Sequence, residues 1–206
     1  MRGTQTGTRR PCAVAFRVAR SIDGVATPLP PIDVEQVEEF WTRVVASGVV
    51  DPSTLLPSVV EPFGDSRELA DELLALVVDG PKRATAAALA DLEQDQTALP
   101  VPGGMSIATD GQGRARAVLR TTDVRVGPLS SVDDAFAWDE GEGDRTRRTW
   151  LADHEEFFER FLPTIGLAFE PDMLTVFERF EVLYSEGPTT RVADEAEPST
   201  TDRAHE

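Results

Sequence analysis

The chain has 206 residues, of which 40% are hydrophobic and 28% are charged, and its formal net charge is −17. This size and apolar content suffice for a single domain with flanking segments, and no apolar run is long enough to cross a membrane. The acidic balance argues against tight binding of long DNA or RNA, because such binders carry a basic surface.

Cysteine and histidine are scarce, which bears on disulfides, metals and compartment. The chain has one cysteine and two histidines. One cysteine forms no internal disulfide, and these residues offer no metal-ligand spacing, so we expect neither a metal nor another cofactor. Since no signal peptide is recognisable, we expect a cytoplasmic protein without a membrane partner.

The first half of the chain predicts helices. Residues 1–31 lack periodicity and end in a proline-rich stretch, so we interpret them as a mobile extension. A helix is expected from the capping residue Asp33 to Gly48. A second capping signal at Asp65 predicts another helix that ends near Gly80. Residues 86–92 predict a further short helix.

The second half predicts mainly strands. Segments 105–109 and 115–126 flank a turn at 110–113 that is typical of a β-hairpin. A loop rich in glycine and acids covers 139–144, and residues 146–161 predict a helix with Trp150 and His154 on one side.

The chain closes with an alternating strand pattern at 173–184 and a polar acidic tail at 186–206, which we expect to be disordered. Because helices and strands mix without regular alternation, the fold class is α+β, with one domain at 32–185.

Lysine usage singles out one position. All basic residues except Lys82 are arginines. A primary amine can lose its proton, whereas a guanidinium group keeps its charge. The lone lysine therefore indicates a chemical role, with a stray surface lysine as the alternative.

Several short motifs along the chain are informative as a combination. They are Phe63-Gly-Asp-Ser66, Gly80-x-Lys82-x-Ala84-Thr85, Arg120-Thr-Thr122, Glu140-Gly-Glu-Gly-Asp144, Trp150 with His154, and Glu178-Arg-Phe-Glu181. Over residues 63–184 this set resembles the signature of the ASCH-domain family. The resemblance implies a PUA-like fold, a small mixed or antiparallel β-barrel with flanking helices, and roles in RNA metabolism. Some similar proteins are amidohydrolases of N4-acetylated cytidine, and ribonuclease activity is attributed to others.

The family pattern implies three catalytic residues, Lys82, Thr85 and Glu142. Amide cleavage needs an activated nucleophile, a proton carrier and a group that stabilises an oxyanion, and these residue types can supply them. If the segment after Lys82 is helical, Thr85 shares its face. The alternative is a salt bridge in which Lys82 and Glu142 only fix the loop.

Five further side chains are candidates for substrate binding. They are Arg83, Arg120, Thr122, Glu140 and Trp138. Arg83 stands where the family commonly has threonine, a departure that bears on substrate fit. Arg120 could hold a phosphate or a carbonyl, or could be an exposed strand arginine. Trp138 could stack on a base.

The leading functional hypothesis is a metal-free amidohydrolase of N-acylated nucleosides. The alternative is a module that binds RNA or a modified nucleotide without catalysis, and a ribonuclease ranks third. The expected partner is a small nucleoside-like ligand or a short RNA, and not long DNA. The sequence does not predict the oligomeric state.

Overall fold

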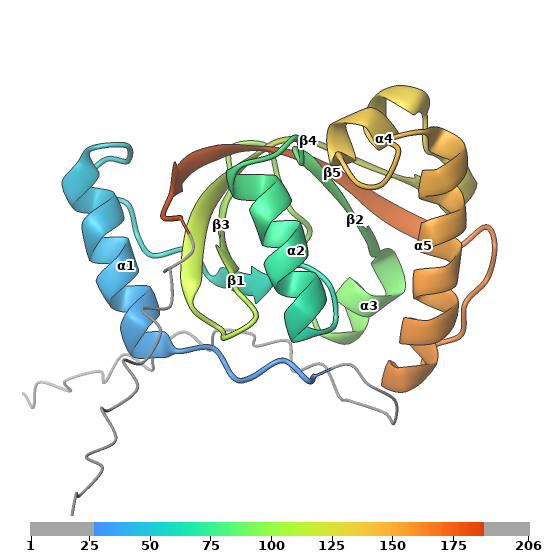
Figure 1. Ribbon diagram of the computed structural model, residues 1–206, viewed down its shortest axis with the longest axis horizontal. Coiled ribbons are helices and arrows are strands. Elements are labelled where there is room, and N and C mark those ends of the chain that lie inside the picture. Colours follow the sequence, from blue (N-terminus) through green and yellow to red (C-terminus); the bar gives the residue numbers. More distant parts are fainter. Residues whose placement is uncertain (1–26, 188–206) are drawn as a thin grey trace, which may run out of the picture.

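Residues 27–187 are described by the computed structural model, and they form an α+β unit built on one five-stranded sheet (Figure 1). The strands are β1 (Val59–Pro62), β2 (Ala84–Ala88), β3 (Met105–Thr109), β4 (Ala115–Pro128) and β5 (Leu174–Ser185). Their spatial order is β1-β3-β4-β5-β2. Only β1 and β3 run parallel, so the predicted mixed sheet is confirmed.

The sheet curls into a half-barrel around its longest strand. β4 has 14 residues, and its pairing with β5 shifts register at Val118/Leu119 and again at Thr121/Asp123. Irregularities of this kind bend a strand and increase its twist. The curl brings the edge strands β1 and β2 around the same concave side, which positions the site described below.

Five α-helices flank the sheet. They are α1 (Val34–Ser47), α2 (Arg67–Val78), α3 (Leu89–Gln94), α4 (Asp134–Glu140) and α5 (Arg147–Phe161), and two 3-10 turns follow β4 and α5 at Leu129–Ser131 and Leu162–Ile165. Figure 1 shows α1 at one end of the sheet and α4 and α5 at the other.

The helix caps agree closely with the sequence patterns. The Asp33 side chain accepts a hydrogen bond from the backbone N–H of Gln36, and Gly48 ends α1 in a left-handed conformation. For α2 the cap is Ser66, one residue after the predicted Asp65, and its hydroxyl accepts from the N–H of Leu69. Both serine and aspartate suit this position, so spacing alone does not separate them.

The core divides among the faces of the sheet. Phe40 of α1 packs in one cluster with residues of β1, β3 and β4. Val77 of α2 packs in a second cluster with residues of β3, β4 and β5. At the far end, Phe136 of α4 and Trp150 of α5 pack edge to face, and Phe136 makes a similar contact with Phe177 of β5. Burial of each such ring contributes about 1.5–3 kcal/mol.

Three sequence expectations for secondary structure were wrong. No strand was predicted for residues 59–62, but they form β1, and Pro62 is tolerated because this is an edge strand. Residues 86–88 belong to β2, not to a helix, since pairing with β5 overrides the helix preference of alanine. Residues 139–140 end the unpredicted helix α4.

The flanking segments are only partly described. The Thr27 hydroxyl donates to Glu68 at 2.7 Å, and Arg67 donates to the backbone oxygen of Pro28 at 2.9 Å, so 27–28 contact α2. The rest of the predicted extension, 1–26, and the tail from 188 onward lie outside the described residues.

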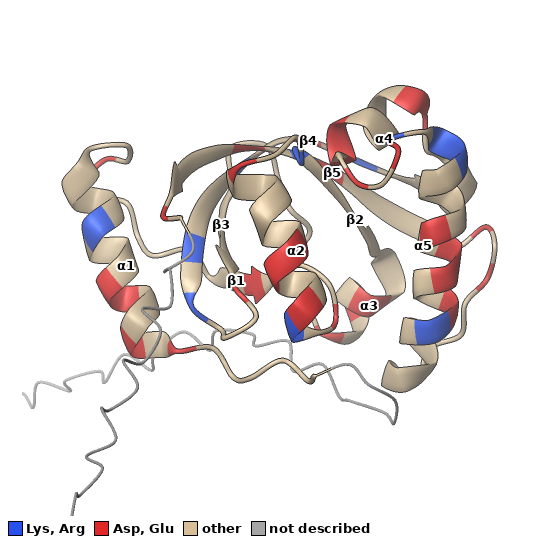
Figure 2. Ribbon diagram, viewed as in Figure 1, with Lys and Arg blue, Asp and Glu red and all other residues tan. Residues whose placement is uncertain are grey.

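The helices carry many charged residues. Acidic residues recur on α1, α2 and α5, and basic residues are scattered among them (Figure 2). Within residues 27–187, every helix is too short or too polar to cross a membrane.

Candidate functional site

Lys82 lies in the turn between α2 and β2, with its side chain inside the protein. Its backbone N–H donates to the oxygen of Leu76 at 3.0 Å, and the side chain is 1% exposed. The ammonium group donates to Glu140 at 3.4 Å and to Glu142, and it lies 5.4 Å from the ring centroid of Phe63. The lysine singled out by the sequence is therefore a buried ion-pair centre and not a surface cation.

Glu140, the last residue of α4, collects donors from three side chains. Besides Lys82, the indole N–H of Trp150 donates to it, and the Nε2 atom of His154 lies 3.5 Å away. Burial acts to raise the pKa of Glu140, but the charges of Lys82 and His154 outweigh it and lower the pKa to about 2. Glu140 thus stays ionised while almost completely buried.

His154 is held beside this carboxylate by its own helix. Its Nδ1 atom lies 2.9 Å from the backbone oxygen of Trp150, and the two rings stack. Burial acts to lower the pKa of His154, but the neighbouring Glu140 carboxylate reverses the effect and raises it. The prediction that Trp150 and His154, four residues apart, lie on one side of a helix is confirmed.

The loop after α4 carries the second carboxylate. Gly141 and Gly143 adopt left-handed conformations with φ of 74° and 52°, which glycine reaches without a Cβ penalty. A Cβ on Gly141 would lie 2.7 Å from the backbone nitrogen of Lys82. This close approach lets Glu142, 31% exposed, reach the ammonium group from the solvent side.

A cavity of about 570 Å³ lies on the concave side of the half-barrel. Its walls include residues of all five strands of the sheet, together with α3 and α5. Phe63, which Lys82 contacts, is one of the lining residues, whereas Lys82 itself is not. The ion-pair centre therefore lies at the margin of the cavity, behind the Phe63 ring.

Thr85 lies apart from Lys82. It is on β2, directly opposite Glu178 of β5, and both line the cavity. Thr85 and Lys82 do not share a helical face, because residues 84–88 form a strand. Of the three predicted catalytic residues, the structure brings Lys82 and Glu142 into contact and places Thr85 in the adjoining cavity.

Most of the predicted substrate-binding residues lie elsewhere. Arg83 donates to the backbone oxygens of Val77 and Lys82, at 3.0 and 2.5 Å, and so ties the turn together. Apart from Glu140, described above, the other three predicted residues are exposed. Arg120 pairs with Glu181, and the side chain of Thr122 is exposed. Trp138 is 57% exposed, and the guanidinium group of Arg145 lies over its ring.

Glu178 was not among the residues predicted from the sequence to form the site. It was quoted only as part of a motif, and the alternation of residues 173–184 marked its strand without showing which face the cavity would occupy. Pairing with Thr85 and the curl of the sheet decide that Glu178 lines the cavity.

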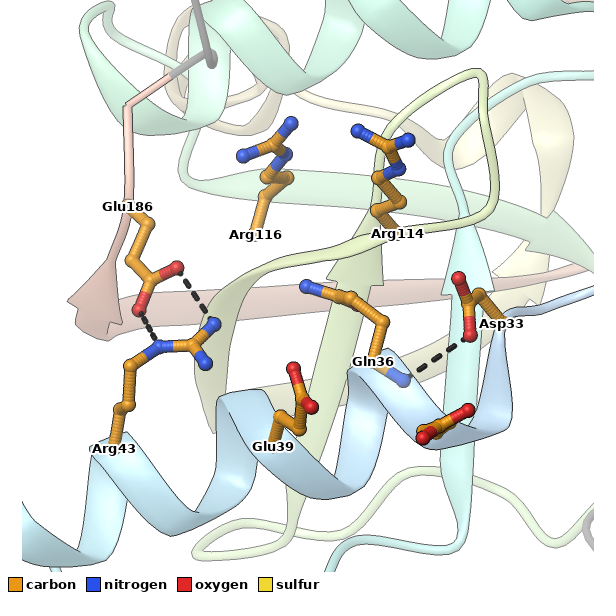
Figure 3. Close-up of a pocket in the computed structure, with 8 residues that line it drawn as sticks. Asp33, Gln36, Glu39, Arg43, Arg114, Arg116 and Glu186 are labelled. Atoms are coloured by element: carbon orange, nitrogen blue, oxygen red, sulfur yellow. Dashed lines mark hydrogen bonds and ion pairs between the residues drawn. The ribbon is translucent and has the colours of Figure 1, made fainter.

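A second hollow, of about 380 Å³, lies between α1 and the beginning of β4 (Figure 3). Its lining side chains carry both signs of charge, and Arg43 pairs with Glu186 at 2.7 Å. None of the predicted site residues lines it.

The half-barrel with flanking helices, and the buried lysine between two glutamates, define a PUA-like protein of the ASCH type. The family model for the ASCH domain matches residues 59–184, and the chain belongs to this family.

The solved structures that are similar to the chain include the following two. Protein EF3133 from Enterococcus faecalis V583, of the family model DUF984, is 37% identical over 72% of this chain and 88% of its own, with a TM-score of 0.65. An ASCH domain from Lactobacillus crispatus JV V101 is 27% identical over 73% of this chain and 95% of its own, with a TM-score of 0.64. No functionally curated protein matches the chain significantly.

Proposed function

We propose that this ASCH-domain protein is an amidohydrolase that removes the acyl group from N-acylated nucleosides of the N4-acetylcytidine kind. The observation that supports this most is the contact of Lys82 with Glu142 at the margin of a cavity of about 570 Å³. Sites for small molecules typically enclose about 300–1,000 Å³, and the volume of this cavity falls within that range.

In the proposed reaction, water attacks the acyl carbon and the C–N bond breaks, which gives a carboxylic acid and the free amine. Glu142, on the accessible side of the ion pair, takes a proton from the attacking water and returns it to the leaving nitrogen. The ammonium group of Lys82 stabilises the oxyanion that forms on the acyl oxygen. Thr85 donates a hydrogen bond to the substrate from the cavity wall.

Glu140 has a different part in this proposal from the substrate contact expected from the sequence. Its carboxylate is fully engaged by Lys82, Trp150 and His154 and is buried behind them. It fixes the position of the ammonium group, so that Glu142 and not Glu140 meets the substrate. Glu140 is thus a positioning residue.

The test is hydrolysis of N4-acetylcytidine by the purified full chain, followed as cytidine release. Lys82→Arg keeps a positive charge but changes its shape and place, and we expect kcat/KM to fall at least about 100-fold, the scale of losing one oxyanion donor. Arg43→Lys is the matched control, since it exchanges the same two cations at an exposed pair on α1. Absence of turnover across a panel of acylated nucleosides, or full activity of Lys82→Arg, would contradict the proposal.

One observation favours a second candidate, a module that binds a modified nucleoside without catalysis. Lys82 is engaged by two carboxylates and is not among the residues that line the cavity. In that case nucleoside binding would persist in Lys82→Arg, and the wild type would show no turnover.

A further inference from the structure

Glu178 stands out among the cavity residues because no step above uses it. It lies in the middle of β5, in register with Thr85 on β2. Residues directly opposite one another in an antiparallel pair project from the same face of the sheet. Thr85 and Glu178 thus form a polar pair on the cavity wall, where both are lining residues.

Within the described part of the chain, the Glu178 carboxyl group accepts one side-chain hydrogen bond and pairs with no cation. The Thr121 hydroxyl donates to one of its oxygens at 2.6 Å. Among residues 27–187, Glu178 takes part in no salt bridge, unlike Glu140 and Glu142. Burial raises the pKa of Glu178, the Thr121 hydrogen bond opposes this, and the Glu61 carboxylate raises it further. Glu178 is partly exposed and lines the cavity, so its carboxyl group can accept a further hydrogen bond from a ligand there.

The surroundings of Glu178 restrict the chemistry of that ligand. Much of the cavity lining is apolar, including the rings of Phe63, Phe158, Phe161 and Phe180. These surfaces suit a flat heteroaromatic base. Within the described part of the chain, no lysine, arginine or histidine lines the cavity, so a phosphate would meet no counter-charge there.

We infer that Glu178 is a substrate-binding residue that holds an N–H or hydroxyl donor of an uncharged nucleoside and so sets the specificity of the cavity. The choice of a nucleoside rests on the proposed function; the placement of Glu178 in the cavity does not. Thr121 orients the carboxyl group, and Thr85 adds a hydroxyl beside it.

The first test measures the Kd of cytidine, the proposed product, by calorimetry, so that turnover does not interfere. Glu178→Gln keeps the size of the side chain but removes the charge-assisted hydrogen bond, and we expect the Kd to rise about tenfold or more. Glu181→Gln is the matched control, because Glu181 lies on the same strand but pairs with Arg120 at an exposed position. An unchanged Kd in Glu178→Gln would overturn the inference.

The second test starts with wild-type protein, so its first result does not depend on the folding of a variant. Four analogues each lack one donor group of cytidine, a hydroxyl or the amino group: 2′-deoxycytidine, 3′-deoxycytidine, 5′-deoxycytidine and N4,N4-dimethylcytidine. At least one should bind about tenfold more weakly than cytidine. In a folded Glu178→Gln variant, that difference should largely disappear. Equal binding of all four analogues, or a difference that Glu178→Gln leaves intact, would overturn the inference.

These results separate the inference from the proposed function. Nucleoside binding that depends on Glu178, without hydrolysis by the wild type, would remove the amidohydrolase and keep the binding role. Hydrolysis with an unaltered KM in Glu178→Gln would keep the amidohydrolase and remove the binding role of Glu178. Failure to bind or hydrolyse any nucleoside would remove both.

Discussion

The ammonium nitrogen of Lys82 lies 3.4 Å from a carboxyl oxygen of Glu140, and each side chain is only 1–2% exposed. Ion pairs so deeply buried are not strong net stabilisers, since both charges lose their hydration. Removing one partner is nevertheless costly, because it leaves the other charge uncompensated. The pair therefore ties the position of α4 to that of the lysine, and the predictions below follow from this coupling.

Glu140→Gln should lower the free energy of unfolding by about 3–5 kcal/mol at neutral pH, measured by urea denaturation. Glu142→Gln is the matched control, and its loss should be smaller because Glu142 is partly exposed. Since the pKa of Glu140 falls from 4.5 to about 2 on folding, its stabilisation is present above pH 4.5 and is lost as the pH falls toward 2. Equal losses in both variants, or a loss independent of acid pH, would contradict this.

His154 should contribute a pH dependence of the opposite sign. Its pKa is raised above 6.5 in the folded state, so its stabilisation is complete below that pH and disappears as the pH rises through the folded value. We expect the stability difference between wild type and His154→Gln to shrink as the pH is raised above 6.5 in urea titrations. A difference that is constant across this range would show that the imidazole acts only through packing.

Gly141→Ala should lower the stability of the fold much more than Gly166→Ala. Both Gly141 and Gly166 have positive φ, 74° and 81°, so alanine strains either by about 1 kcal/mol. Only at Gly141 would the new Cβ meet backbone, 2.7 Å from the nitrogen of Lys82, whereas nothing lies within 4 Å at Gly166.

The difference between the two glycine variants is the quantity to measure. Thermal unfolding should place Gly141→Ala several degrees below Gly166→Ala. Hydrolysis should also drop in Gly141→Ala alone, because the loop that carries Glu142 must move. Similar melting temperatures would show that the loop yields without cost.

Phosphorylation of the substrate should reduce turnover by the wild-type protein. The cavity lining includes the carboxyl groups of Glu61, Asp65, Asp91, Asp95 and Glu178 and, in the described residues, no basic side chain. We expect kcat/KM for N4-acetylcytidine to exceed that for its 5′-monophosphate by about tenfold or more, since like charges repel in a cavity of low dielectric constant. Equal rates, compared by cytidine and cytidine monophosphate release, would place the sugar outside the cavity.

Local chemistry made several elements predictable. The turn at 110–113 carries the glycines that a tight hairpin needs, and β3 and β4 flank it as an antiparallel pair. The capping residues Asp33 and Thr146 start α1 and α5 where the patterns begin. These signals act over a few residues, so they are legible without tertiary contacts.

Other elements depend on partners far along the chain. β1 has only four residues and a proline, and it becomes a strand through pairing with β3. The alanine-rich segment 84–88 would suit a helix, and β5 makes it a strand. That switch moved Thr85 away from Lys82 and beside Glu178.

By itself the sequence determined the family and the α+β class and singled out one lysine, because motif spacing and residue choice can be read directly along the chain. The tertiary structure alone decided that Glu140 is buried, that Thr85 and Glu178 share a wall, and that the lysine lies behind Phe63. The physical reason is that strand register and sheet curl, set by contacts between distant segments, determine which side chains face the cavity.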